Sequence, residues 1–360
     1  MSNQEHKPLT EWADEKSAAV QEENQAIARA NRLLRSKVRE QEVEVEVLRE
    51  RVGLYESLDD ARLQSPVWVI PKKKGATHNA IPCFGLGDLH WGEVVNPDRI
   101  DGVNKFNVAI ATARTRLAFE KVVTLARRYM AGLAFDGIQV FFTGDMVGGL
   151  IHEELKATNE EEMTESVLGT AEALSAGLHM LADEFGSVKV AAVVGNHSRL
   201  SKKMPTKNPQ ECVDWLVYRM VARDFRTDDR VSVYSPKALG ANATVYGTKY
   251  YLTHGTQFTG GSGISGMASP LLLGTHRATR RAAASGKPFD VMVLGHFHQA
   301  FFWPSKGLIV CGCPKGYDEF ARSREYEPEP AQATLWITTP EHGITGYYPI
   351  FCSDRNAEGW

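Results

Sequence analysis

The chain has 360 residues, of which 43% are hydrophobic, so it can bury a sizeable core in one large domain or two small ones. Its formal net charge of −3 predicts no binding to polyanions unless a basic patch gathers locally, and its five cysteines, few and odd in number, argue against a secreted disulfide scaffold and favour a reducing, cytoplasmic setting. The sequence shows no apolar segment typical of a signal peptide and no run of about 18 apolar residues, so we expect no membrane span.

Residues 1–60 predict a helix that forms a coiled coil. Over residues 20–55 there is no proline, and the seam positions recur in alternating steps of four and three, about five heptads in all. The a positions are Asn24, Asn31, Val38, Val45 and Val52, and the d positions include Ile27, Leu34 and Leu48. This pattern favours a parallel two-stranded coil and therefore a homodimer, with buried asparagines fixing the register. Two alternatives stay open: a lone amphipathic helix packed on the rest of the protein, and a strand over residues 42–47, where EVEVEV alternates.

Residues 61–79 carry two prolines, a lysine run and a glycine, and they predict a linker with a short strand. From residue 80 onward, apolar strands alternate with helical patterns, and strands alone follow near the end. This order is typical of a layered α/β domain. Strands are expected within residues 80–88, 137–145, 188–197, 289–298, 307–313, 331–339 and 343–351, a hairpin within 243–255, and helices within 105–133, 161–186, 209–225 and 269–286.

Side chains that can bind metal stand at the ends of five of these strands, each beside a glycine. The motifs are GDLHWG, GD, GNH, HG and GHFH, and their candidate ligands are Asp88, His90, Asp145, Asn196, His254, His296 and His298. Because ligands bind at the carboxyl ends of strands in open α/β sheets, we expect these side chains to converge on one crevice. In an extended segment residues i and i+2 face the same way, which would point His296 and His298 to one side.

The ligand types indicate which ions fit. Imidazole with carboxylate suits Mn, Fe, Zn or Ni, whereas purely oxygen sites suit Mg or Ca. The candidates are too many for one ion with an open position, so two ions that share a carboxylate fit better; such a pair, about 4 Å apart, clamps a phosphoryl group and generates a hydroxide nucleophile. Each motif alone would be ordinary turn chemistry or a plain surface histidine. Five in order at strand ends favour the metal site.

In this order the motifs resemble those of the calcineurin-like metallophosphoesterase superfamily, over residues 80–355. The resemblance implies a four-layer α/β/β/α sandwich around two divalent ions, with Mn expected and Fe, Zn, Ni or Mg as alternatives. It implies one ion held by Asp88, His90 and His298. It implies a second ion held by Asn196, His254 and His296, with Asp145 as the bridge. His197 would contact phosphate and protonate the leaving oxygen, a role that suits an imidazole whose pKa is near the working pH.

Two departures bear on the branch of the superfamily. Family members often carry an acidic residue after Gly-Asn-His, which orients that histidine, but this chain has Ser198. The GDLHWG opening resembles the SbcD-type DNA-repair exonuclease branch, which places a histidine three residues after the second aspartate; here that position is Gly148, and His152 either serves instead or is a plain surface residue. A compact phage-type member of the superfamily is the nearest overall resemblance.

Basic residues follow two of the metal motifs and indicate a polyanionic substrate. Arg199, Lys202 and Lys203 come after the GNH motif and are candidate substrate-binding residues with His152, while Arg277, Arg280, Arg281 and Lys287 come after the HG motif. The alternative is an ordinary solvated loop and helix face. We therefore predict a Mn-dependent phosphodiesterase that acts as a DNA nuclease; the alternatives are a phosphomonoesterase on proteins or small molecules and a non-catalytic scaffold.

Overall fold

The computed structural model describes residues 8–59, 78–149, 151, 153–202, 207–208, 210–259 and 267–353. By its internal contacts the chain forms two compact units, Met1–Lys73 and Lys74–Trp360. The predicted linker falls almost entirely outside the described residues, and the domain boundaries at residues 60 and 79 stay a prediction. Within the described residues, no helix combines the length and apolar character needed to cross a bilayer.

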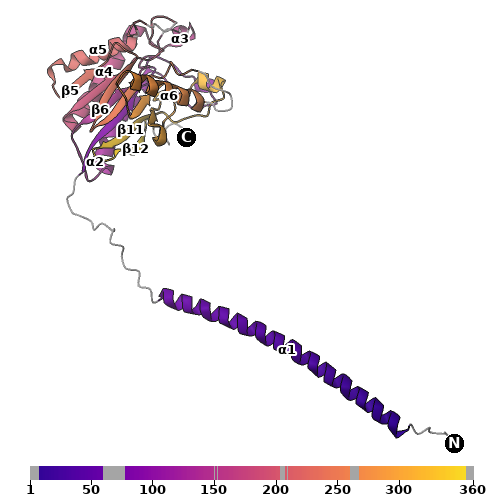
Figure 1. Ribbon diagram of the computed structural model, residues 1–360. Coiled ribbons are helices and arrows are strands. Elements are labelled where there is room, and N and C mark those ends of the chain that lie inside the picture. Colours follow the sequence, from indigo (N-terminus) through magenta and orange to yellow (C-terminus); the bar gives the residue numbers. More distant parts are fainter. Residues whose placement is uncertain are drawn as a thin grey trace. The chain divides into compact units, whose positions relative to one another are not determined.

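The first unit is one continuous helix, α1 (Leu9–Asp59), drawn in indigo in Figure 1. Residues 42–47 are helical, so the strand alternative for EVEVEV is wrong. Over residues 8–53 every side chain is exposed, including the seam residues Ile27, Leu34 and Leu48. Helix α1 therefore has an apolar seam that its own side chains leave open to solvent, and the coiled coil stays a prediction.

The second unit is a mixed α/β structure with two sheets. The larger sheet has the order β12-β11-β1-β3-β4-β5, with β2 beside β1; β1 to β5 run parallel, and β11 and β12 are antiparallel to their neighbours. Its strands are β1 (His78–Leu86), β2 (Leu133–Phe135), β3 (Ile138–Phe142), β4 (Val188–Ala192), β5 (Val231–Tyr234), β11 (Gln332–Thr339) and β12 (Gly343–Phe351). The short strands β2 and β5 were not expected from the sequence.

The smaller sheet has the order β6-β7-β8-β10-β9. The predicted hairpin is present as β6 and β7, which pair antiparallel, and β7, β8 and β10 run parallel. Its strands are β6 (Gly240–Val245), β7 (Thr248–Thr253), β8 (Val291–Leu294), β9 (Phe301–Trp303) and β10 (Leu308–Val310). Strand β9 is a further short strand that the sequence pattern did not indicate.

The four long helices of this unit lie where helical periodicity predicts them. They are α2 (Val108–Tyr129), α4 (Met163–Phe185), α5 (Val213–Asp224) and α6 (Ala268–Ala284). The cap of α2 explains its start, because the Asn107 side chain accepts the Ile110 N–H at 2.9 Å. Short helical segments that were not expected are α3 (Glu153–Thr158), α7 (Glu319–Ser323) and the 3₁₀ turns η1 (Pro97–Arg99), η2 (Phe225–Thr227) and η3 (Pro304–Lys306).

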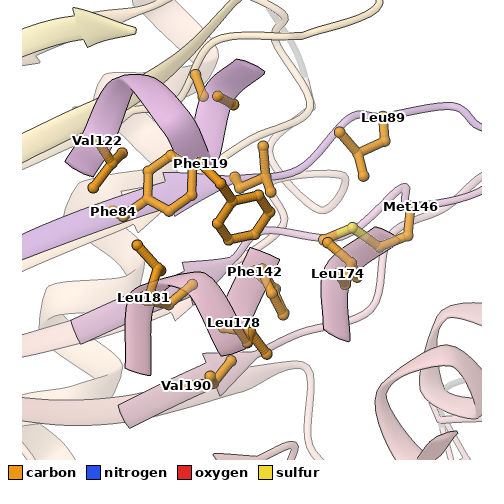
Figure 2. Packing of buried hydrophobic residues seen from close by; sticks show 14 of the residues in the cluster. Phe84, Leu89, Phe119, Val122, Phe142, Met146, Leu174, Leu178, Leu181 and Val190 are labelled. Atoms are coloured by element: carbon orange, nitrogen blue, oxygen red, sulfur yellow. The ribbon is translucent and has the colours of Figure 1, made fainter. Parts of the chain in front are cut away.

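Strands β3, β8, β10 and β11 are buried along their whole length, because both faces of each sheet are covered at these strands. On one face of the larger sheet, Phe84 and Phe142 pack against Phe119 of α2 and Leu178 of α4 (Figure 2). Side chains on the other face of the larger sheet belong to a second cluster, which also contains residues of the smaller sheet. Its members include Phe141 of β3 and Tyr250, Leu252, Val293 and Ile309 of the smaller sheet. A third cluster places Leu271 and Ala278 of α6 against Tyr251, Met292, Leu294, Leu308 and Val310.

Tyr250 joins the two sheets most directly. Its ring lies 5.4 Å from that of Phe141, and its hydroxyl is 2.7 Å from Thr338 Oγ1 and accepts the indole N–H of Trp336 at 3.2 Å. A buried tyrosine needs such partners for its hydroxyl. This contact fixes the smaller sheet against the larger one, and with it the relative position of the strand ends that carry the metal motifs.

Candidate metal centre

The strand-end motifs lie side by side because strand pairing continues past the strands. Beyond β1 and β3, the Asp88 N–H donates to Gly144 O at 2.8 Å and the His90 N–H to Asp145 O at 3.1 Å. Beyond β7 and β8, the Gly295 N–H donates to His254 O at 3.1 Å. Backbone hydrogen bonds therefore set the spacing of the candidate ligands within each sheet before any side chain contributes.

The first group of ligand atoms comes from Asp88, His90 and His298. His90 Nε2 lies 3.1 Å from His298 Nε2, and Asp88 Oδ1 lies 3.4 Å from His298 Nε2 and 4.0 Å from His90 Nε2. Asp88 and His90 are fully buried. Atoms bound to one ion at about 2.1 Å stand roughly 3–4.2 Å apart, depending on the angle between them, so this spacing suits a shared cation.

The second group comes from Asp145, His254 and His296, which lie close to Asn196. His254 Nε2 is 3.0 Å from Asp145 Oδ2 and 3.1 Å from Asn196 Oδ1, and the Thr256 hydroxyl donates to the same Asn196 oxygen at 2.8 Å. The structure thus brings together all seven residues singled out as ligands in two adjoining groups. Thr256, which orients the Asn196 amide, was not noticed in the sequence.

The histidine tautomers test whether a cation fits. His254 Nδ1 lies 2.8 Å from the Thr143 carbonyl oxygen, which can only accept, so Nδ1 carries a hydrogen and Nε2 faces the two oxygens of Asp145 and Asn196. That arrangement needs a positive charge between them. A proton can fill the place: although burial lowers it, the charge of Asp145 raises the pKa of His254 to about 9. A metal ion fits the same place, and the outer hydrogen bond to Nδ1 is usual for metal-bound histidine.

The backbone at five of these ligands is left-handed. Asp88, His90, Asp145, His296 and His298 all have positive φ, between 48° and 68°, and they are five of the eight non-glycine residues in that region among the described residues. They lie beyond the ends of the strands rather than in extended strand. His296 and His298 nevertheless line the same cavity, and they belong to different groups, as the resemblance implies. Left-handed backbone at non-glycine residues is strained and clusters at functional sites.

Two glycines let the carboxylates approach the neighbouring motifs. A Cβ on Gly195 would overlap Asp145 Oδ1, and a Cβ on Gly295 would overlap Asp88 Oδ2. In the space so left, the Asp145 carboxylate accepts the His197 N–H at 2.7 Å, and the Asp88 carboxylate accepts the His296 N–H at 3.1 Å. Each aspartate therefore fixes the backbone of a second motif as well as facing a ligand group.

The candidate acid His197 stands next to the first group and lines the same cavity as His296 and His298. Its Nδ1 is 3.3 Å from Glu93 Oε1 and 3.3 Å from Gly148 O. Although burial lowers it, the charges of Asp145 and Glu93 raise the pKa of His197. Glu93 thus provides the acidic neighbour that Ser198 does not. It lies three residues after His90 in GDLHWGE, so its place in the motif was visible in the sequence, but its contact with His197 was not.

Asp214, in the first turn of α5, is a second carboxylate that the sequence did not indicate. It is fully buried, and its two oxygens accept the backbone N–H groups of Asp145 at 2.9 Å, Met146 at 3.1 Å and Gly195 at 2.9 Å. Burial and the charge of Asp145 raise the pKa of Asp214 to about 6. Asp214 therefore ties together the turns after β3 and β4, which carry Asp145, Asn196 and His197.

A cavity of about 670 Å³ adjoins the two ligand groups. It is lined by Asp145, Asn196, His197, His296 and His298, by apolar and aromatic side chains that include Phe258, Met267, Pro270, Phe297, Phe320 and Tyr326, and by the charged residues Glu93, Arg99, Lys315, Asp318 and Glu319. Phe320 and Tyr326 are more than half exposed at 63% and 51%. This size is typical of a small-molecule site.

None of the predicted substrate-binding residues is seen on the cavity wall among the described residues. Neither Arg199 nor Lys202 is among the described residues that line the cavity, and Arg199 instead donates to Asn196 O at 3.0 Å. Lys203 and His152 lie outside the described residues. The basic residues of and after α6, Arg277, Arg280, Arg281 and Lys287, are exposed, and Arg281 stacks over Tyr251 with 4.9 Å to the ring centroid.

Comparisons with known proteins give only remote likenesses. No protein-family model and no curated protein match the chain. Among solved structures, vacuolar protein sorting 29 from Cryptosporidium parvum is 12% identical over 75% of this chain and 98% of its own, with a TM-score of 0.30. Wild-type Vps29 from Entamoeba histolytica, complexed with Zn²⁺, is 11% identical over 75% and 99%, with a TM-score of 0.29. A protein of unknown function from Aquifex aeolicus is 12% identical over 69% and 94%, with a TM-score of 0.28. Likenesses this weak do not assign a family or an activity, so both must be argued from the site.

The role of Asp214 can be tested by an isosteric change. Asp214→Asn replaces one accepting oxygen by an amide NH₂ that faces backbone N–H groups, so at least one buried donor loses its partner. We expect the free energy of unfolding to fall by about 2–4 kcal/mol in urea titrations. Asp224→Asn, at the exposed end of the same helix, is the matched control and should change it by less than about 0.5 kcal/mol. An equal, small effect of both changes would contradict the role given to Asp214.

Proposed function

We propose that the chain is a metal-dependent phosphoesterase of the calcineurin-like metallophosphoesterase type. The observation that carries the proposal is the pair of adjoining ligand groups, Asp88-His90-His298 and Asp145-His254-His296, with His197 beside them on one cavity. The order of the motifs along the chain supports the same superfamily. The four-layer α/β/β/α sandwich belongs to this proposal, and the three hydrophobic clusters over and between the sheets support it.

The described residues would have separate roles in binding metal and in proton transfer. The first group would hold one divalent ion and the second, with Asn196, another, and Asp145 would be shared between the two. When bound, such ions supply a nucleophilic hydroxide near neutral pH and neutralise charge on the phosphoryl oxygens. His197, which lines the cavity, would donate a proton from Nε2 to the leaving oxygen. Mixed nitrogen and oxygen ligands favour Mn, with Fe, Zn, Ni and Mg as alternatives.

The cavity lining favours a small phosphate ester with an aromatic group over DNA. Among the described residues, four acidic side chains line the cavity against two from Lys or Arg, namely Arg99 and Lys315, and Lys315 is already engaged by Glu93 and Asp318 at 2.9 and 2.6 Å. DNA backbone is bound by clustered Lys and Arg. The exposed rings of Phe320 and Tyr326 instead offer stacking partners for a flat group. The second candidate function is a DNA nuclease of the SbcD type, because basic segments follow two of the metal motifs in the sequence.

A metal-by-substrate panel tests the function. Purified protein loaded with Mn, Zn, Fe, Ni or Mg is assayed on phenyl phosphate, p-nitrophenyl phosphate, bis-p-nitrophenyl phosphate, methyl phosphate, and single- and double-stranded DNA. We expect Mn-dependent cleavage of the aryl esters and none of DNA. Faster cleavage of DNA than of aryl esters would restore the nuclease candidate. A protein that binds no transition metal and cleaves nothing would be the scaffold.

Removal of a metal ligand and removal of the general acid should affect metal content and kcat differently. Asp145→Ala should abolish turnover and release bound metal, measured by plasma mass spectrometry, because it removes the shared carboxylate. His197→Ala should keep the metal and lower kcat by about 10²–10⁴, the usual contribution of a positioned general acid. His276→Ala, on the exposed face of α6, is the control and should change neither quantity. Loss of metal in His197→Ala to the same extent as in Asp145→Ala would show that His197 is itself a ligand.

We further propose that α1 makes the protein a parallel homodimer through its heptad seam. Adjacent leucines give a matched test, since Leu34 is at a d position and Leu33 lies off the seam, and both are 63% exposed in the single chain. Leu34→Asp should shift the mass measured by light scattering from dimer towards monomer, because it buries a charge in the seam. Leu33→Asp should leave the dimer intact, and neither should alter hydrolysis of a small ester. If the wild-type protein is a monomer by light scattering, the coiled-coil dimer is excluded.

A further inference from the structure

Glu93 is a buried carboxylate with three charged or chargeable partners. Its Oε1 is 2.7 Å from His90 Nδ1 and 3.3 Å from His197 Nδ1, and its Oε2 accepts Lys315 Nζ at 2.9 Å. The residue is only 5% exposed. Because it is paired with the buried ammonium of Lys315, the Glu93 carboxylate is an acceptor for both imidazoles.

Gly148 leaves the space that Glu93 fills. A Cβ on Gly148 would lie 2.5 Å from Glu93 Cγ and 3.2 Å from its Oε1, so any side chain at this position would displace the carboxylate. The Gly148 carbonyl is at the same time the second acceptor next to His197 Nδ1. A residue without a side chain thus brings its backbone and the Glu93 carboxylate to the same imidazole nitrogen.

Lys315 and its loop hold Glu93 in place. The Lys315 ammonium is 2% exposed and lies between Glu93 and Asp318. The Lys315 carbonyl accepts Arg114 Nη1 at 2.6 Å and Asn104 Nδ2 at 2.9 Å, which fixes the loop after β10 to α2 and to the segment before it. Because both its backbone and its side chain are held, Lys315 restricts the rotamers of the Glu93 carboxylate.

His90, Glu93 and His197 also lie close enough together to suggest a third ion. The buried ammonium of Lys315 at 2.9 Å from the same carboxylate argues against it, since a metal ion there would stand next to the positive charge of Lys315 and compete with it for Glu93. The His90 ring is better described as bonded outward to Glu93 through Nδ1 and inward to the first ligand group through Nε2. Glu93 therefore acts from outside the ligand groups.

We propose that Glu93 is the positioning residue for His197, holding its Nδ1–H so that Nε2 faces the leaving oxygen in the cavity. This inference rests on the proposed phosphoesterase function. Because Glu93 and the Gly148 carbonyl next to Nδ1 can only accept, the hydrogen sits on Nδ1, and Nε2 is then the nitrogen that exchanges a proton with substrate. Glu93 thereby takes the part of the acidic residue that is missing at Ser198.

Leaving-group dependence separates positioning from mere stability. A p-nitrophenolate leaving group needs no proton, whereas methoxide does. In Glu93→Gln, which keeps the shape and removes the charge, we expect kcat for methyl phosphate to fall at least about 10-fold more than kcat for p-nitrophenyl phosphate. Asp318→Asn is the matched control, since it also removes a negative charge from Lys315 but contacts neither imidazole; it should change both rates by the same factor. Metal content is measured for each variant, because Glu93 also contacts His90.

A double-mutant cycle and a spectrum complete the test. In a His197→Ala background, Glu93→Gln should change kcat for methyl phosphate by less than about 3-fold, because the residue it positions is gone. In long-range ¹⁵N–¹H spectra of the metal-free protein, His197 should show the Nδ1–H tautomer in the wild type and a mixture in Glu93→Gln. Equal loss on both esters, or an unchanged His197 spectrum, would overturn the inference. Wild-type protein that cleaves neither ester would refute the proposed function alone, and the spectrum would still decide the Glu93 contact.

Discussion

Negative charge buried at one sheet edge is the constraint on which the site depends. Four carboxylates near the cavity are almost or fully buried: Asp88, Glu93, Asp145 and Asp214. A buried carboxylate is tolerated only when it is paired or hydrogen-bonded. Asp214 is satisfied by three backbone N–H groups and Glu93 by Lys315 and imidazole, which leaves Asp88 and Asp145 facing histidines whose Nε2 atoms need a positive charge between them. The electrostatics of the fold therefore favour divalent cations at this edge.

The two sheets supply different parts of this arrangement. The segments after strands of the larger sheet contribute Asp88, His90, Asp145 and Asn196. Those after strands of the smaller sheet contribute His254, His296 and His298. Each ligand group contains residues from both sheets, so the buried contacts of Tyr250 and Phe141 between them also set the distances between ligands. Packing far from the cavity and coordination within it are thus parts of one structure.

Sequence patterns predicted what is local and missed what depends on distant partners. The strands and helices that carry the motifs, and the residues at the strand ends, follow from runs of apolar residues that end in glycine and a ligand type, as at Val291–Leu294 before His296. Lys315 and Asp214 gain their roles from partners that are remote in sequence; Lys315 and its partner Glu93 are 222 positions apart. The short strands β2, β5 and β9 have too few residues for a period to emerge. The left-handed backbone at His296 and His298 does not follow from strand alternation and was visible only in the structure.

The link from Arg114 to the Lys315 loop has a consequence for how the cavity meets its ligand. Arg114 is buried on α2, and its guanidinium holds the carbonyls of Pro314 and Lys315, so this wall of the cavity is assembled as the helix docks on the sheet. The entropy of ordering Lys315, Glu93 and His197 is then lost during folding, not on association with an ester. Such preorganisation makes the wall selective by shape: an ester must conform to it, and adaptation to different alcohols is left to the aromatic rim formed by Phe320 and Tyr326.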